Sequence, residues 1–116
     1  MTKQRGLFAL VTLAFLFAGS QRVAAAEPAQ KDIEQNDKVR VYQTTYHPGD
    51  VSPSQKRSMR VVHVLEGGTL ERTYADGTKE TIVWKNGETR IASDERPYAV
   101  KNTGKTSVRL LIVALK

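Results

Sequence analysis

Short runs of alternating hydrophobic and polar residues follow one another from Val39 to the end of the chain. Most of these runs are rich in β-branched and aromatic residues, which is typical of strands with one buried face. None shows the 3.6-residue period of an amphipathic helix. We therefore predict strands over residues 38–46, 60–67, 69–75, 78–84, 88–92, 98–102 and 107–115.

Turn residues separate the predicted strands and indicate how they connect. The HPGD sequence at 47–50 favours a turn, and the Asp-Gly pair at 76–77 and the Asn-Gly pair at 86–87 are two-residue β-hairpin signals. The run 107–115 is apolar on both faces, so we expect a central strand covered on both sides. Short strands with frequent turns predict an all-β sandwich or barrel.

The N-terminal segment has the pattern of a secretory signal peptide. Lys3 and Arg5 give a basic start, residues 7–18 are apolar, and three alanines at 24–26 provide the small residues of a cleavage site. The apolar run would make about 18 Å of helix, too short to cross a hydrocarbon core of about 30 Å. We predict that residues 1–26 are removed and that the protein is periplasmic or secreted. The alternative is an uncleaved N-terminal anchor.

Removal of the signal peptide would leave one small domain. Residues 27–37 are polar and predict a flexible leader, and residues 38–116 form the predicted barrel domain. Fifteen basic and twelve acidic residues would remain, so the net charge would fall from +6 to +3. We expect no nucleic-acid partner, because this charge is small and scattered, and no membrane partner after cleavage. The chain has no cysteine, so the domain must be stable without disulfides.

Several short motifs occur in a specific order along the predicted barrel domain. They are PGD (48–50), VVHVLEGG (61–68), ADG (75–77), KNGE (85–88) and RPYAVKNTGKTSVRLLIV (96–113). Together they resemble the small single-domain cupins, a family of jelly-roll β-barrels. The resemblance covers about residues 40–115, nearly the whole domain, and implies a single jelly-roll barrel.

The resemblance also implies a metal site, and this chain departs from it. Cupins usually hold a divalent metal with an H-x-H-x3-E cluster before the VLEG strand and with a later His. Alignment without gaps places Ser54, Lys56 and Arg60 at the cluster positions and Tyr98 at the later one. None of these side chains offers the imidazole or carboxylate ligands that Zn, Fe, Mn or Ni prefer. We therefore predict no metal and no cofactor.

The same positions suggest a different ligand. Ser54, Lys56 and Arg60 share strand parity, so an extended chain would point them the same way, toward the barrel interior. Arg offers a planar fork to a carboxylate, sulfate or phosphate, and Tyr98 could add a hydroxyl. The hypothesis is an anion-binding pocket. The alternative is that the cations lie on an exposed loop, or that Arg60 pairs with Glu66, Glu71 or Glu95.

The two histidines and the tryptophan have structural interpretations. Strand alternation places Arg60 and Val62 on one face of their strand and His63 on the other, so we expect His63 to be structural or at an interface. His47 precedes a proline in a turn and is expected at the rim. Trp84 ends an apolar run and is interpreted as a core or rim aromatic, with a ligand-stacking platform as the alternative.

The sequence therefore predicts an exported, metal-less cupin that binds a small, anionic ligand, with no identifiable catalytic residues. One alternative is a divergent enzyme acting on a small carbohydrate or organic acid, for which Tyr98 could serve as an acid but has no histidine base beside it. Another is an interaction module. We also expect a homodimer, with the outward-facing Val61, His63 and Leu65 buried against a leader strand or a second subunit.

Overall fold

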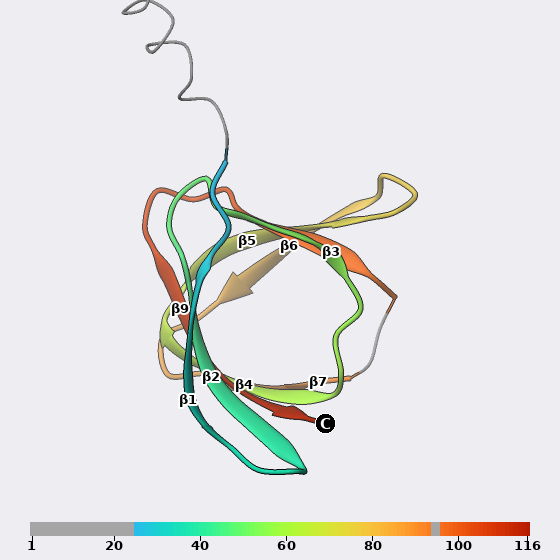
Figure 1. The fold of residues 1–116 in the computed structure, drawn as a ribbon. Coiled ribbons are helices and arrows are strands. Elements are labelled where there is room, and N and C mark those ends of the chain that lie inside the picture. The colour runs from blue at the N-terminus through green and yellow to red at the C-terminus, as the bar shows by residue number, and fades with distance from the viewer. Residues whose placement is uncertain (1–24, 94–95) are drawn as a thin grey trace, which may run out of the picture.

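The computed structural model describes residues 25–93 and 96–116. Over these ranges the chain forms nine β-strands and no helix (Figure 1). The strands are β1 (Ala29–Gln35), β2 (Val39–Tyr46), β3 (Val51–Gln55), β4 (Arg60–Glu66), β5 (Gly68–Tyr74), β6 (Lys79–Trp84), β7 (Thr89–Ala92), β8 (Tyr98–Asn102) and β9 (Val108–Leu115). No helix within these two ranges is long and apolar enough to span a bilayer.

The strands form two antiparallel sheets that enclose the hydrophobic core (Figure 1). One sheet has five strands in the order β1-β2-β9-β4-β7, and the other has four in the order β3-β8-β5-β6. Consecutive strands often lie in different sheets, so most connections cross from one sheet to the other. This arrangement confirms the predicted all-β jelly-roll barrel.

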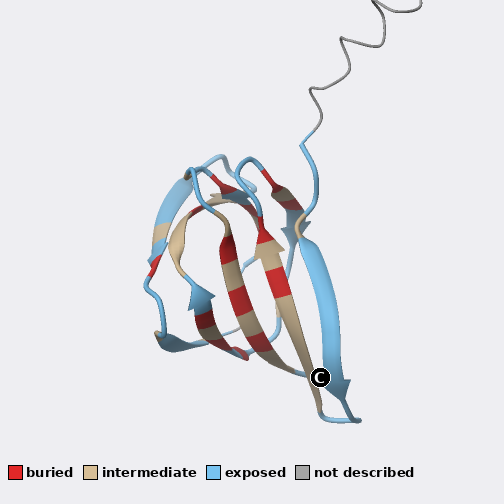
Figure 2. Ribbon diagram, turned by 90° about the vertical axis from the view of Figure 1, so that its left-hand side faces the viewer, coloured by how far each residue is buried: buried red, intermediate tan, exposed pale blue. Residues whose placement is uncertain are grey.

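The core follows the two-residue period of the strands (Figure 2). In β4, Arg60, Val62 and Val64 are buried, whereas Val61 and Leu65 are exposed, as the alternation predicted. Burial of each aliphatic side chain contributes about 1.5–3 kcal/mol to folding. The buried hydrophobic residues are Tyr46, Val62, Val64, Leu70, Trp84, Tyr98, Val100, Val108, Leu110 and Ile112.

The two predicted hairpin turns have different outcomes. The Asp-Gly turn at 76–77 joins β5 to β6, which pair antiparallel, and Gly77 has a φ of 89°, a value that glycine adopts readily. The Asn-Gly pair at 86–87 also forms a turn, with a φ of 78° at Gly87. It is not a hairpin, because β6 belongs to the four-stranded sheet and β7 pairs with β4 in the other. A local turn signal does not specify which strand the following strand pairs with.

The polar segment predicted as a flexible leader contains a strand. Residues 29–35 form β1, which pairs with β2 at the edge of the five-stranded sheet. All seven side chains are exposed, so the segment has no hydrophobic period to mark it as a strand. Its backbone hydrogen bonds and an ion pair between Arg40 and Asp32 (2.6 Å) attach it to β2. The predicted signal peptide, apart from residues 25 and 26, lies outside the described residues.

Strand β3 was not among the predicted strands, and it contains an irregularity that matters for the cavity. It lies at a sheet edge, where Pro53 is tolerated. Ser52 pairs with Val100 and Gln55 pairs with Tyr98, so one extra residue of β3 is accommodated between them. Such a β-bulge reverses the alternation of side chains along the strand.

Strand β9 is the central strand of the five-stranded sheet, as predicted. Its inward side chains Val108, Leu110 and Ile112 are buried, but Arg109 and Leu111 on the other face are only half-buried. The prediction that both faces are covered is therefore wrong for the described chain, because no further layer of these residues lies against the outer face.

Asn102 fixes the connection between β8 and β9. Its side chain is 1% exposed, and its Nδ2 atom donates to the carbonyl oxygens of Tyr46 and Thr106, both at 2.9 Å. Its Oδ1 atom accepts from the backbone N–H of Gly104 at 2.9 Å. The side-chain amide thus uses both donor hydrogens and its oxygen, which gives the NTG motif at 102–104 a structural role.

Candidate functional site

A cavity of about 360 Å³ lies between the two sheets, near the start of β4 and the end of β9. The charged side chains that line it, within the described ranges, are all cationic. No Asp, Glu or His occurs among the lining residues in the described ranges. The cationic lining residues are Arg40, Lys56, Arg57, Arg60, Arg72 and Lys116.

Tyr98 is the centre of a cluster of three arginines. The ring is almost fully buried, and its hydroxyl oxygen accepts a 2.7 Å hydrogen bond from Nη2 of Arg60. The guanidinium carbons of Arg57 and Arg72 each lie 4.3 Å from the centre of the same ring. Cation–π attraction and one hydrogen bond thus gather three positive charges on one side chain.

Arg57 is held in place by neutral acceptors. Its Nη1 atom donates to the backbone oxygens of Tyr98 (2.8 Å) and Gln55 (3.1 Å), and its Nη2 atom donates to Oγ of Ser52 (3.2 Å). Ser52 also accepts from the Tyr46 hydroxyl at 3.4 Å. Burial raises the pKa of the Tyr46 phenol, so this group stays neutral and adds no compensating negative charge.

Arg60 is buried. Of the three glutamates proposed as its ion-pair partner, Glu66 and Glu71 are wrong because each pairs with another cation. Glu66 pairs with Arg109 on the outer face, and Glu71 pairs with Lys79. Besides the Tyr98 hydroxyl, Arg60 donates to the backbone oxygen of Ser58 at 3.2 Å. The third alternative, Glu95, lies outside the described residues.

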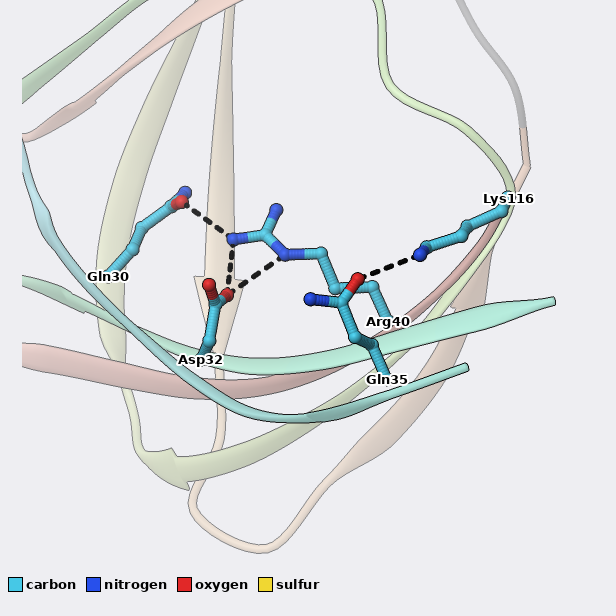
Figure 3. A network of polar contacts seen from close by, with 5 residues as sticks. All are labelled: Gln30, Asp32, Gln35, Arg40 and Lys116. Atoms are coloured by element: carbon cyan, nitrogen blue, oxygen red, sulfur yellow. Dashed lines mark hydrogen bonds and ion pairs between the residues drawn. The ribbon is translucent and has the colours of Figure 1, made fainter. Parts of the chain in front are cut away.

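Arg40 lines the rim of the cavity and is oriented by β1 (Figure 3). Its Nε and Nη2 atoms donate to Oδ1 of Asp32 at 2.9 and 2.6 Å, and Nη2 also reaches Gln30 at 3.4 Å. Its guanidinium carbon lies 4.1 Å from the centre of the Tyr42 ring. Beside it, Lys116 donates to Gln35 at 2.7 Å. The edge strand therefore positions two of the rim cations.

The structure brings together three of the four predicted site residues. Lys56, Arg60 and Tyr98 all line the cavity. Ser54 does not: its side chain is exposed, and the lining positions of β3 are Ser52 and Gln55. The reason is the bulge in β3, which shifts the parity on which the prediction depended.

Part of the cavity wall is apolar. It is formed by inward-facing side chains of both sheets, some of which pair directly with residues of the arginine cluster, as Ala114 does with Arg60 and Val100 with Arg72. The apolar lining residues are Val62, Leu70, Ile82, Trp84, Val100, Leu110, Ile112 and Ala114. The cavity lining thus combines cationic, polar and apolar side chains, and apolar walls with a few polar groups are common in small-ligand sites.

The residues at the family's metal positions do not fit a metal. A divalent transition ion needs imidazole or carboxylate ligands, whereas Lys56 and Arg60 are cationic and Ser54 does not line the cavity. Within the described residues there is also no group of three or more His, Cys, Asp or Glu side chains that could hold a metal ion.

The histidines lie away from the cavity. His47 is in the turn before β3, largely exposed, with Nδ1 3.3 Å from the carboxylate of Asp50. Nδ1 of His63 lies 2.7 Å from the Thr89 hydroxyl on the outer face. Trp84 is buried in the core and lines the cavity wall, with the Arg90 guanidinium 4.4 Å from its ring centre.

Sequence reasoning missed two arginines of the cluster. Arg72 could have been found, because it shares strand parity with the buried Leu70 on β5. Arg57 lies in the segment between β3 and β4, where no periodicity applies, and its inward position depends on Ser52 and on backbone groups of β8. No local signal in the sequence identifies it.

Structural comparison finds similar folds in small bacterial and archaeal proteins. A cupin domain from Bordetella pertussis Tohama I has a TM-score of 0.73 and 19% identity, covering 81% of this chain and 98% of that one. An RmlC-like cupin family protein with a double-stranded β-helix fold from Methanocaldococcus jannaschii has a TM-score of 0.61 and 14% identity, covering 82% and 84%.

A cupin superfamily protein from Desulfitobacterium hafniense DCB-2 has a TM-score of 0.59 and 12% identity, covering 84% of this chain and 85% of that one. No protein-family model and no curated protein matches the chain by sequence. At these identities the comparisons establish the fold.

Proposed function

We propose that this chain, a small single domain with the cupin fold, binds a small anionic ligand inside its barrel. The observation that carries the proposal is the arginine cluster: Arg57, Arg60 and Arg72 all contact Tyr98 in a cavity whose described lining contains no carboxylate. The charge, the geometry and the burial of these side chains all favour a negatively charged guest.

Electrostatics makes the buried charge of Arg60 and the half-buried charge of Arg57 costly without a guest, whereas Arg72 pairs with Glu80 at 3.7 Å. Like charges repel, and removal of a guanidinium from water is unfavourable unless it gains good partners. Arg57 and Arg60 donate to neutral oxygen atoms, which offset only part of that cost. An oxyanion that accepts from several guanidinium N–H groups would form charge-assisted hydrogen bonds, each worth about 1.5–3 kcal/mol.

A thermal-shift panel tests the proposal. Sulfate, phosphate, citrate and glucuronate are added to the purified protein, with sodium chloride at matched ionic strength and neutral glucose as controls. We expect at least one oxyanion to raise the melting temperature, since a ligand at 100 times its Kd stabilises by about 2.7 kcal/mol, or several degrees for a domain of this size. If no oxyanion exceeds sodium chloride, the proposal is wrong.

We further propose that two copies associate through the outer face of the five-stranded sheet. Strand register places Val41, Val113, Val61 and Ile91 in one row across β2, β9, β4 and β7. Val61 and Ile91 are 37% and 72% exposed, which is unusual for a row of four aliphatic side chains. A second copy would bury this apolar row and supplement the small core of a domain without disulfides.

Sedimentation velocity measures this association. We expect the wild-type protein to sediment as a dimer at micromolar concentration and Ile91→Lys as a monomer. Val83→Lys, which adds the same charge to the other sheet at a position 53% exposed, is the matched control and should remain dimeric. A wild-type protein that stays monomeric at the highest soluble concentration would contradict the proposal.

A further inference from the structure

Two of the arginines that line the cavity have carboxylate partners of their own. Arg40 pairs with Asp32 at 2.6 Å. Arg72 pairs with Glu80 at 3.7 Å, and its side chain is only 13% exposed. Neither carboxylate lines the cavity, so each arginine brings its positive charge to the wall while its ion-pair partner stays outside. These two charges are therefore balanced by the protein.

Arg57 and Arg60 have no carboxylate partner among the described residues. All of their hydrogen bonds go to neutral carbonyl or hydroxyl oxygens. Arg60 is buried and Arg57 is half-buried, so water offsets only part of the cost of their charges. The other cations of the lining, Lys56 and Lys116, are exposed to solvent. The cavity thus holds two positive charges that neither the described carboxylates nor bulk water balances.

Both of these charges contact Tyr98. Nη2 of Arg60 donates to its hydroxyl at 2.7 Å, and the guanidinium carbon of Arg57 lies 4.3 Å from its ring centre. The cavity of about 360 Å³ is at the small end of ligand sites, which measure roughly 300–1,000 Å³. One small guest beside Tyr98 is therefore the simplest source of charge for both arginines.

Thr44 provides a second, independent sign of a guest. Its side chain is 3% exposed and lines the cavity, and its Oγ1 atom is the one buried side-chain nitrogen or oxygen of the described chain without a hydrogen-bond partner. Such an unpaired group costs about 1–3 kcal/mol, so most are paired. A hydroxyl can donate to an oxyanion, which only accepts.

Printed contacts connect the neighbourhood of Thr44 with that of Arg57. Thr44 and Tyr46 are successive inward residues of β2, about 7 Å apart along the strand. The Tyr46 hydroxyl contacts Oγ of Ser52 at 3.4 Å, and the same oxygen accepts from Arg57 at 3.2 Å. The unpaired hydroxyl thus belongs to the same polar part of the cavity as the arginines.

We infer that the guest is a small dianion whose oxygen atoms accept hydrogen bonds from Arg57, Arg60 and the Thr44 hydroxyl. This inference rests on the proposed anion-binding function and names its ligand class. A monoanion would leave one of the two arginine charges unbalanced, and a third negative charge would lose its hydration without a cation to offset the loss. The two charges can belong to one tetrahedral group or to two carboxylates.

Two pairs of probes test the inference by isothermal titration calorimetry at fixed ionic strength and slightly alkaline pH. The first pair is sulfate and methanesulfonate, and the second is succinate and succinamate. The members of each pair have similar shapes and differ by one negative charge. We expect the dianion of at least one pair to bind the wild-type protein about tenfold to a hundredfold more tightly, the value of one charge-assisted hydrogen bond. The pair that shows this preference distinguishes a tetrahedral group from a dicarboxylate.

Arg57→Gln assigns the preference to the unbalanced charges. Glutamine can still donate hydrogen bonds but carries no charge, so the preference for the dianion should shrink by about tenfold. Arg109→Gln is the matched control, because Arg109 pairs with Glu66 on the outer face and its loss changes the net charge equally. This variant should keep the wild-type preference, which excludes a general attraction of dianions to a basic protein. Melting temperatures show whether both variants are folded.

Thr44→Val tests the hydroxyl separately from the charge. Valine has nearly the same shape, so both members of a pair should bind about threefold to tenfold more weakly and the preference for the dianion should remain. Thr44→Ser should bind as the wild type does. Thr44→Val should also raise the melting temperature of the ligand-free protein, because it removes an unpaired buried polar group. Wild-type sulfate and succinate affinities in Thr44→Val would contradict the role of this hydroxyl.

The outcomes separate the inference from the function on which it rests. If the monoanions bind as tightly as the dianions, or if the full preference persists in Arg57→Gln, the charge class is wrong and anion binding stands. If the monoanion glucuronate binds but neither sulfate nor succinate does, the charge class is also wrong. If none of the four probes and no oxyanion of the panel binds, both proposals fail.

Discussion

Replacement of Arg60 by glutamine is expected to weaken sulfate binding by about tenfold to a hundredfold. Arg60 is buried, lines the cavity and donates to the Tyr98 hydroxyl and the Ser58 carbonyl oxygen, and we expect its remaining N–H groups to donate to a bound anion. Loss of one charge-assisted hydrogen bond costs about 1.5–3 kcal/mol, which corresponds to this loss of affinity. Isothermal titration calorimetry with sulfate at fixed ionic strength measures the effect.

The matched control is Arg109→Gln. Arg109 lies on the outer face of the same sheet, where it pairs with Glu66, and its replacement changes the net charge by the same amount. We expect this variant to bind sulfate as the wild type does. Arg60→Gln without ligand should melt at or above the wild-type temperature, because it removes a buried positive charge from the cluster. Equal sulfate affinity in both variants would place the anion elsewhere.

Asn102→Asp is expected to destabilise the fold by about 3–5 kcal/mol at neutral pH, the cost of an uncompensated buried charge. The substitution replaces a donating NH₂ group by an oxygen atom that faces the carbonyl oxygens of Tyr46 and Thr106. Both donor bonds are lost, and a carboxylate is buried at a position only 1% exposed. Urea denaturation followed by Trp84 fluorescence measures the free energy of unfolding.

The pH dependence of this variant has a definite sign. Burial beside two carbonyl oxygens raises the folded-state pKa of the new carboxyl group above its unfolded value. The penalty is therefore full above the folded pKa and disappears as the pH falls below the unfolded pKa, so the difference from the wild type should shrink as the pH is lowered. Asn86→Asp is the control: Asn86 is exposed, and its oxygen accepts from Gly67, an interaction that aspartate can keep. A loss of similar size in both variants would contradict the role assigned to Asn102.

The sequence determined those features that depend on neighbours along the chain. Alternation along β4 was sufficient to predict that Arg60 and His63 face opposite sides, because successive side chains of a strand must do so, and the resemblance to the cupins indicated that Arg60 is the inward one. The Asp-Gly pair was sufficient to predict the turn between β5 and β6, since glycine readily adopts the required φ. The ordered motifs, the cationic residues at the family's metal positions and the inward Tyr98 were all recognisable before any coordinates.

Only the tertiary structure decided which side chains meet. The bulge in β3 exchanged Ser54 for Gln55 in the cavity, and it exists because β3 pairs with β8, more than forty residues away. Strand β1 carries no hydrophobic period and is defined by its backbone pairing with β2. The unpaired hydroxyl of Thr44 is a property of the closed barrel, since its neighbours come from strands distant in sequence. Periodicity fixes the direction of a side chain within its own strand, whereas register between strands fixes its partners, and register depends on the whole fold.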